Sequence, residues 1–247
     1  MTRLRFLPFA VVAAFAIAPV AFADVGPAPQ VEARVDVPPA LLTGLARHAE
    51  AFEQMKARGA YTLDGTFEEV ASDGHVASTK EARVRIEARR GDPTPKVDIV
   101  RYLEDGHDKT QEAREKAASR KPKKDKKELK IPFLASEQAR YVFAVVEHDR
   151  NAPTRVRVAF DPKEPAEDAI KGTAWVDTTK GEILSMGFSF SKNPTFINHV
   201  DVTLTFGNTT PLGRAPSAFS FDGRGSFLFI HKHFRGRATI TDARVAY

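Results

Sequence analysis

Two segments in the C-terminal half of the chain, LSMGFSF (residues 184–190) and VDVTLTF (residues 200–206), alternate between apolar residues and small or polar ones. A period of two places the apolar side chains on one face of an extended strand and the polar side chains on the other. Strands of this kind belong to antiparallel sheets that bury one face and expose the other to water. The two segments therefore predict two half-buried antiparallel strands.

Nine further segments carry similar patterns, and turn signals separate many of them, among them Asp73-Gly74, Lys180-Gly181, Asp222-Gly223 and Gly236. About eleven strands with short connections predict a mainly β fold, built on one large and strongly curved antiparallel sheet. The nine further strands are expected at residues 61–70, 75–89, 96–103, 140–148, 154–160, 171–177, 215–221, 226–234 and 237–245.

One amphipathic helix is expected directly before the first of these nine strands. Asp36 is placed to cap it, Pro38-Pro39 fits its first turn, and Gly59 ends it. A lone amphipathic helix has to bury its apolar stripe, and the sequence that follows offers only strands as a surface. The helix is therefore expected to lie on the sheet. Its apolar stripe consists of Leu41, Leu45, Phe52 and Met55, with Leu42 and Ala49 beside them.

The first 23 residues have the pattern of a secretory signal peptide. Arg3 and Arg5 are followed by an apolar run (6–20) and by Ala21-Phe22-Ala23, a small-x-small cleavage site. The alternative, an uncleaved membrane anchor, is disfavoured because the run is shorter than the roughly 20 residues that a spanning helix needs. We therefore expect cleavage after Ala23, export to the periplasm, and a flexible leader over residues 24–37.

The chain has no cysteine. A lipid-anchored bacterial protein needs a cysteine at its cleavage site, so no lipid anchor is expected there. Disulfides are excluded although an exported protein could form them, and stability must come from a hydrophobic core. Residues 38–247 are long enough to form that core as a single domain.

A charged insert at about residues 105–130 interrupts the series of strands. Ten Lys or Arg residues stand against four Asp or Glu residues between Lys109 and Lys130, a local excess of six that is larger than the net charge of +5 of the whole chain. Residues 111–119 have a helical composition, and a basic run follows at 120–127. Because the insert lacks an apolar stripe, it is expected to be mobile. Two roles remain open: contact with anionic lipid headgroups at a membrane surface, or a solvated loop that aids solubility.

Motifs for catalysis are missing from the sequence. It contains no Gly-x-Ser-x-Gly, no phosphate-binding Gly-rich loop and no His-Glu-x-x-His. His231 and His233 share one face of a strand and have the spacing of two metal ligands, but no third ligand can be named. No enzyme, cofactor, metal site or nucleic-acid partner is therefore predicted.

Phenylalanine dominates the aromatic residues, with eighteen Phe against four Tyr and one Trp. Phenyl rings offer apolar area without a hydrogen-bonding group. Two interpretations remain open: the rings fill an ordinary β-sandwich core, or they line an apolar cavity for acyl chains that one helix covers incompletely. The residues expected to line such a cavity are Trp175, Leu184, Met186, Phe188, Phe190, Val200, Val202, Leu204, Phe206, Phe219 and Phe221.

The segment GTAWVDTTKGEI (residues 172–183) resembles a hairpin of the outer-membrane lipoprotein-sorting (LolA-like) superfamily. The order of the other segments is also similar: a signal peptide, an amphipathic helix, long hairpins, and Pro132-Phe133 before the aromatic strand that starts at Tyr141. The resemblance implies an unclosed β-barrel of about eleven strands, capped by helices, around an apolar cavity. In the carriers of this superfamily a strand arginine lies near the cavity mouth, and Arg83, Arg85 or Arg101 is a candidate for that position.

The resemblance also implies a function in the cell envelope. The first expectation is a periplasmic, monomeric, non-enzymatic carrier that binds the acyl chains of a lipid or lipoprotein. The alternative is a periplasmic sensor or regulator that uses the same half-barrel to bind a membrane protein. The missing lipid-attachment cysteine fits a shuttle better than an anchored receptor, and the lid helices of the carriers have no match in the basic insert.

Overall fold

The computed structural model describes residues 35–88, 95–119, 129–227 and 230–245. This part of the chain forms one antiparallel sheet of twelve strands and two α-helices, α1 (Pro39–Arg58) and α2 (Thr110–Ala118). The strands are β1 (Val35–Asp36), β2 (Gly59–Val70), β3 (Val76–Glu87), β4 (Lys96–Glu104), β5 (His107–Asp108), β6 (Tyr141–His148), β7 (Arg155–Pro162), β8 (Ile170–Asp177), β9 (Glu182–Phe190), β10 (Ile197–Thr210), β11 (Gly213–Phe227) and β12 (Ile230–Val245).

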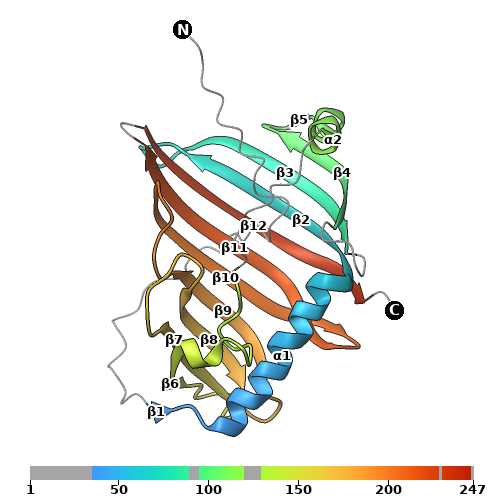
Figure 1. Ribbon diagram of the computed structural model, residues 1–247. Coiled ribbons are helices and arrows are strands. Elements are labelled where there is room, and N and C mark those ends of the chain that lie inside the picture. The colour runs from blue at the N-terminus through green and yellow to red at the C-terminus, as the bar shows by residue number, and fades with distance from the viewer. Residues whose placement is uncertain (1–34, 89–94, 120–128, 228–229, 246–247) are drawn as a thin grey trace.

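The sheet is strongly curved and does not close (Figure 1). Its strand order is β1-β6-β7-β8-β9-β10-β11-β12-β2-β3-β4-β5, so β1 and β5 are its two edges. The long pairing of β12 with β2, from His233 opposite Val70 to Val245 opposite Gly59, joins the C-terminal strands to the N-terminal ones. The expected fold class, an unclosed, curved antiparallel half-barrel with an N-terminal helix, is confirmed.

Helix α1 lies on one face of the sheet, here called the inner face, and contacts β9, β11, β12 and β2 (Figure 1). The stripe expected from the sequence is buried, with Leu45 and Ala49 fully enclosed. Gly59 ends the helix and begins β2 directly, and a Cβ at this position would lie 2.3 Å from the Met55 carbonyl oxygen. The expected cap is wrong: Asp36 lies in β1 opposite Ala144, because the chain reaches the helix from the edge of the sheet.

One row of cross-strand neighbours runs through the inner face and contains five aromatic rings, with a glycine between two of them at two places. Gly172 separates Phe160 from Phe188, and a Cβ on Gly172 would lie 2.0 Å from the Gly187 carbonyl oxygen. Glycine at such positions makes room for the rings on both sides. The row is Phe143, Phe160, Gly172, Phe188, Val202, Phe221, Gly236, Phe67, Lys80 and Glu104.

The C-terminal strands correct the sequence analysis. The three strands expected at 215–221, 226–234 and 237–245 are two long strands, β11 and β12. Gly223 and Gly236, which we expected in turns, lie in mid-strand opposite Phe234 and Phe67 respectively. These glycines therefore do not turn the chain. They lie beside aromatic rings, next to which a residue without a side chain leaves space. The turns expected at Asp73-Gly74 and Lys180-Gly181 are confirmed, with positive φ at both glycines.

The charged insert is partly ordered, which also corrects an expectation. Its helical segment forms α2, which buries Ala113 against Ile99 and Tyr102 of β4. The Arg114 Nε–H donates to the Ile99 carbonyl oxygen at 2.8 Å. One buried alanine makes no visible apolar stripe, but together with such hydrogen bonds it docks a short helix. The basic run, the signal peptide and nearly all of the leader lie outside the described residues, and no described helix is long and apolar enough to cross a membrane.

Candidate functional site

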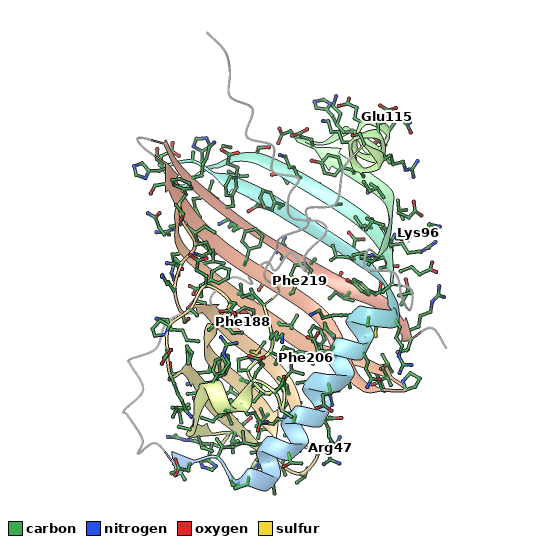
Figure 2. All side chains as sticks on the ribbon, viewed as in Figure 1. Arg47, Lys96, Glu115, Phe188, Phe206 and Phe219 are labelled. Atoms are coloured by element: carbon green, nitrogen blue, oxygen red, sulfur yellow. The ribbon has the colours of Figure 1, made fainter. Side chains whose placement is uncertain are left out.

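The inner face has a closed half, formed by β6 to β10 and by the parts of β11 and β12 that carry Phe219, Ala238 and Ile240, against which α1 and the segment 129–134 pack. Phe133 and Phe160 have no exposed surface, and their rings lie 5.6 Å apart, edge to face. The Phe133 ring also stacks on Phe143 at 5.3 Å. Figure 2 shows Phe188, Phe206 and Phe219 on the side of the sheet that α1 covers. This half is a sealed hydrophobic core.

The inner face also has an open half, formed around Phe67 of β2, Phe221 of β11 and Phe234 of β12, with β3 beside them. Phe67 and Phe221 belong to the inner face because their cross-strand row also contains Phe188 and Val202 of the core. Phe234 shares this face because it lies opposite Gly223, two residues after Phe221 in β11. The Phe67 ring lies 5.6 Å from Phe221 and 5.4 Å from Phe234, and all three side chains are only half-buried. Helix α1 contacts β2, β11 and β12 and joins β2 at Gly59, whereas Phe67 lies further along that strand (Figure 1). We call these three residues the open aromatic group.

Two ion pairs border the open aromatic group on the same face. Lys80, opposite Phe67 in the register, has its Nζ 3.3 Å from Glu104 Oε1. Glu69, opposite Phe234, pairs with Lys232 of β12. The apolar surface therefore ends in a charged rim, where a polar group attached to an apolar chain can remain solvated.

The residues expected to line a cavity separate into three groups, and their role as a lining stays a prediction. Val200 and Phe221 are half-buried and pack against the core from the open side. Leu184, at a register shift between β8 and β9, and Phe190 are also half-buried. Trp175 lies on the outer face, where the Arg157 guanidinium is 5.5 Å from its ring centre. The residues buried in the core are Met186, Phe188, Val202, Leu204, Phe206 and Phe219.

The sequence analysis missed two members of the open aromatic group, Phe67 and Phe234. Phe67 continues an alternation that starts at Tyr61 and Leu63, which are both half-buried against the core. That alternation was a usable signal in the sequence. The strand expected at 226–234 stops at Phe234, because Gly236 has the pattern of a turn. The place of Phe234 inside one long strand is therefore not visible in the sequence.

His48 fastens α1 to the sheet. Its Nδ1 accepts a hydrogen bond from the Ile183 N–H of β9, and its Nε2–H donates to the Arg214 carbonyl oxygen of β11, both at 2.9 Å. The side chain is 6 % exposed, and this burial lowers the pKa of His48, because the charged imidazolium would lose its solvation. Glu182 and Arg214, which are the charged groups that face His48, form a 2.9 Å ion pair with each other. The ring is therefore neutral, with its proton on Nε2.

Of the two histidines considered as metal ligands, one contacts a carboxylate and the other is exposed to solvent. His233 Nε2 lies 2.9 Å from both carboxylate oxygens of Asp222, and His231 is exposed. Within the described ranges, no three His, Cys, Asp or Glu side chains are arranged to hold a metal ion.

No family model matches this chain, and no curated protein does. The chain is similar to several solved structures. One is a LolA superfamily protein from Nitrosomonas europaea (9 % identity, 81 % of this chain and 94 % of that chain, TM-score 0.34). Another is a putative outer membrane lipoprotein-sorting protein domain from Vibrio parahaemolyticus (13 % identity, 83 % and 93 %, TM-score 0.35). A third is MucB in complex with MucA(peri) (11 % identity, 82 % and 94 %, TM-score 0.23).

All three TM-scores lie below 0.5, so these likenesses carry no argument about function.

The strand register shows which face of the sheet carries the arginines suggested for the cavity mouth. Val84, between Arg83 and Arg85, is buried on the inner face, so both arginines point to the outer face. Arg101 lies directly opposite Arg83 and shares that face. None of the three reaches the open aromatic group from its place in the sheet.

Proposed function

We propose that this protein is a non-enzymatic carrier that binds the acyl chain of a lipid or lipoprotein on the open half of its inner face. The open aromatic group (Phe67, Phe221 and Phe234) supports this most directly, because its rings carry no hydrogen-bonding group and are incompletely covered. A hydrocarbon chain laid across them gains about 0.8 kcal/mol for each methylene removed from water. A polar ligand would gain no specific contact there.

The surroundings of this surface fit a ligand with one polar end. On one side the rings continue into the sealed core through Val200 and the Phe221 side chain. On the other side the pairs Lys80–Glu104 and Glu69–Lys232 form the charged rim. An acyl chain would lie on the rings with its headgroup at the rim, where both charges and water are available.

The proposed setting is the periplasm, which the N-terminal signal pattern with its site at Ala23 supports. We propose a monomer with lipid or lipoprotein acyl chains as its ligands and no nucleic-acid partner. The basic run at residues 120–127 would make transient contact with anionic headgroups during loading or release.

A single charge on the open aromatic group tests the carrier proposal. Phe67→Asp places a carboxylate on the proposed binding surface, and Thr66→Asp, one residue earlier, places it on the outer face as a matched control. We expect Phe67→Asp to weaken binding of a fluorescent fatty acid by about tenfold or more, because the chain would then lie against a charge. Thr66→Asp should bind like the parent.

Far-ultraviolet circular dichroism of both variants should remain that of a β protein. Parent-like fatty acid binding by folded Phe67→Asp would remove the open aromatic group as the site. Native mass spectrometry of protein isolated from the periplasm separates the two functions. A carrier should hold lipid, whereas the alternative, a regulator that binds a membrane protein through the same half-barrel, should hold protein and no lipid.

A further inference from the structure

A second candidate site lies away from the inner face, beside the edge of the sheet. A groove of about 740 Å³ runs between the start of α2 and strands β3 and β4, and a smaller groove of about 70 Å³ shares Arg83 and Arg101 with it. Besides these two arginines, the larger groove is lined by Val100, Asp108, Lys109 and Arg114 and by residues of the first turn of α2, Glu112 among them. The groove is open to solvent and uses none of the residues of the proposed acyl-chain site.

Two arginines face each other at the centre of this region. Arg83 and Arg101 are directly opposite in the register of β3 and β4. Like charges in directly opposite positions destabilise a sheet. Arg83 has one carboxylate nearby, Asp64, at 3.5 Å, and no hydrogen bond or ion pair joins Arg101 to any other residue of the described ranges. The two guanidinium groups therefore have only partial compensation, from Asp64 beside Arg83 and from Asp108, whose pKa the Arg101 charge lowers.

A third guanidinium is held in place by carbonyl oxygens. Arg114 Nε–H donates to the Ile99 carbonyl oxygen at 2.8 Å, and its Nη2 lies 3.5 Å from the Val100 carbonyl oxygen. These contacts orient the guanidinium and leave its remaining N–H groups available. A guanidinium fixed in this way is already arranged for a planar, two-point contact with an oxyanion.

The carboxylates around the groove are mostly engaged. Asp108 accepts the Thr110 backbone N–H at 2.8 Å, and its pKa is lowered by hydrogen bonds from Thr110 and by the charges of Arg101 and Arg114. Glu112 pairs with Lys109 at 2.7 Å. Asp64 and Glu81 line the smaller groove and reduce the charge of the arginine pair there. On the side toward α2, Asp108 is one carboxylate beside two guanidinium groups, so the charges of Arg101 and Arg114 together exceed its charge.

We propose that this groove binds a phosphate group, held by Arg101 and Arg114 with Arg83 as a flanking charge. Guanidinium groups recognise phosphate oxygens through paired, charge-assisted hydrogen bonds. The phosphate comes from free phosphate or from the headgroup of an anionic phospholipid. Val100, 41 % exposed in the wall of the groove, is an apolar contact that a lipid can use and free phosphate cannot. The site does not depend on acyl-chain binding by the inner face.

The test compares two variants of the full chain that lose the same charge. Arg101→Gln removes a guanidinium from the groove. Arg85→Gln removes one from the same outer face, opposite Asp98 and outside the groove, so any general effect of charge on anion binding is equal in both. Calorimetric titration with inorganic phosphate should give saturable binding that Arg101→Gln weakens by about tenfold, the size of one charge-assisted contact, and Arg85→Gln leaves unchanged.

Co-sedimentation with vesicles identifies the source of the phosphate. A loss specific to Arg101→Gln on phosphatidylglycerol vesicles, with no binding to phosphatidylcholine vesicles by any variant, assigns the site to anionic lipid. A loss seen only with inorganic phosphate assigns it to the free anion. Equal behaviour of the two variants in both assays, with unchanged melting temperatures, overturns the proposal. Loss of acyl-chain binding in Phe67→Asp should leave the phosphate titration unaffected, so the two proposals fail separately.

Discussion

At the scale of single residues, the inner face depends on where glycine stands beside an aromatic ring. Gly236 allows the Phe67 and Phe221 rings to meet across a strand, and a Cβ there would lie 2.7 Å from the Thr66 carbonyl oxygen. His48 has a comparable role for the helix, because its two ring nitrogens join α1 to two different strands. In both cases the neighbouring groups determine where a side chain lies: a missing Cβ makes room for two rings, and two backbone groups bind the imidazole.

The His48 contact predicts a pH dependence of stability. Protonation of Nδ1 would place an N–H against the Ile183 N–H, and burial already lowers the pKa of this ring below its usual 6.5. Between the lowered folded pKa and 6.5 the unfolded chain binds more protons, so stability should fall as the pH falls below 6.5 and be constant above it. Urea denaturation at pH 5 to 8 measures this.

His48→Leu provides the comparison for that measurement. It leaves the Ile183 N–H and the Arg214 carbonyl group without their partner, so it should lower stability at every pH by about 1–3 kcal/mol. It should also flatten the slope below pH 6.5. The exposed His231 serves as a control through His231→Asn, which should keep the parent slope. An unchanged slope in His48→Leu would show that another group titrates.

At the scale of elements, strand length and helix docking follow from few contacts. β11 and β12 run for 15 and 16 residues, because neither Gly223 nor Gly236 turns the chain. α2 is ordered on β4 by Ala113, which is 2 % exposed, and by the Arg114 hydrogen bond. A nine-residue helix has little stability by itself, so these contacts determine whether it forms.

A charge at the docking position should therefore release α2. Ala113→Glu buries a carboxylate against Ile99 and Tyr102, whereas Ala117→Glu adds the same charge at an exposed position one turn further along the same helix. We expect amide exchange over residues 110–118 to become fast in Ala113→Glu and to stay slow in Ala117→Glu, with a cost of about 1–3 kcal/mol for the former. Equal protection in the two variants would mean that Ala113 does not hold the helix.

At the scale of the whole molecule, a single sheet makes both a core and an uncovered apolar surface. The aromatic row crosses both halves, from Phe143 and Phe160 under the helix and the 129–134 segment to Phe67 beyond them. Twelve strands give more inner face than one 20-residue helix can cover, so part of the row stays half-exposed. The inner face has a closed and an open half because the sheet is larger than the helix that covers it, and no single strand causes this division.

The division predicts unequal costs for equal truncations. Phe160→Ala removes a fully buried ring that contacts Phe133 and should lower stability by about 3–5 kcal/mol. Phe67→Ala removes a half-buried ring and should cost only about 1–2 kcal/mol, because part of its surface is already in water. Chemical denaturation of the two variants measures the difference. Similar costs would indicate a continuous sealed core, as in the sandwich interpretation.

The local pattern of the sequence determined the strands, the long helix and the mainly β class, because periods of two and of three to four residues are properties of neighbouring residues. It could not distinguish a mid-strand glycine from a turn at Gly223 or Gly236, since only the cross-strand ring reveals the difference. The tertiary structure alone decided that β12 pairs with β2, that Trp175 faces outward beside Arg157, and that Phe234 joins Phe67. The physical reason is the same in each case: register and coverage arise from segments far apart in the chain, and burial is settled only when the whole sheet is assembled.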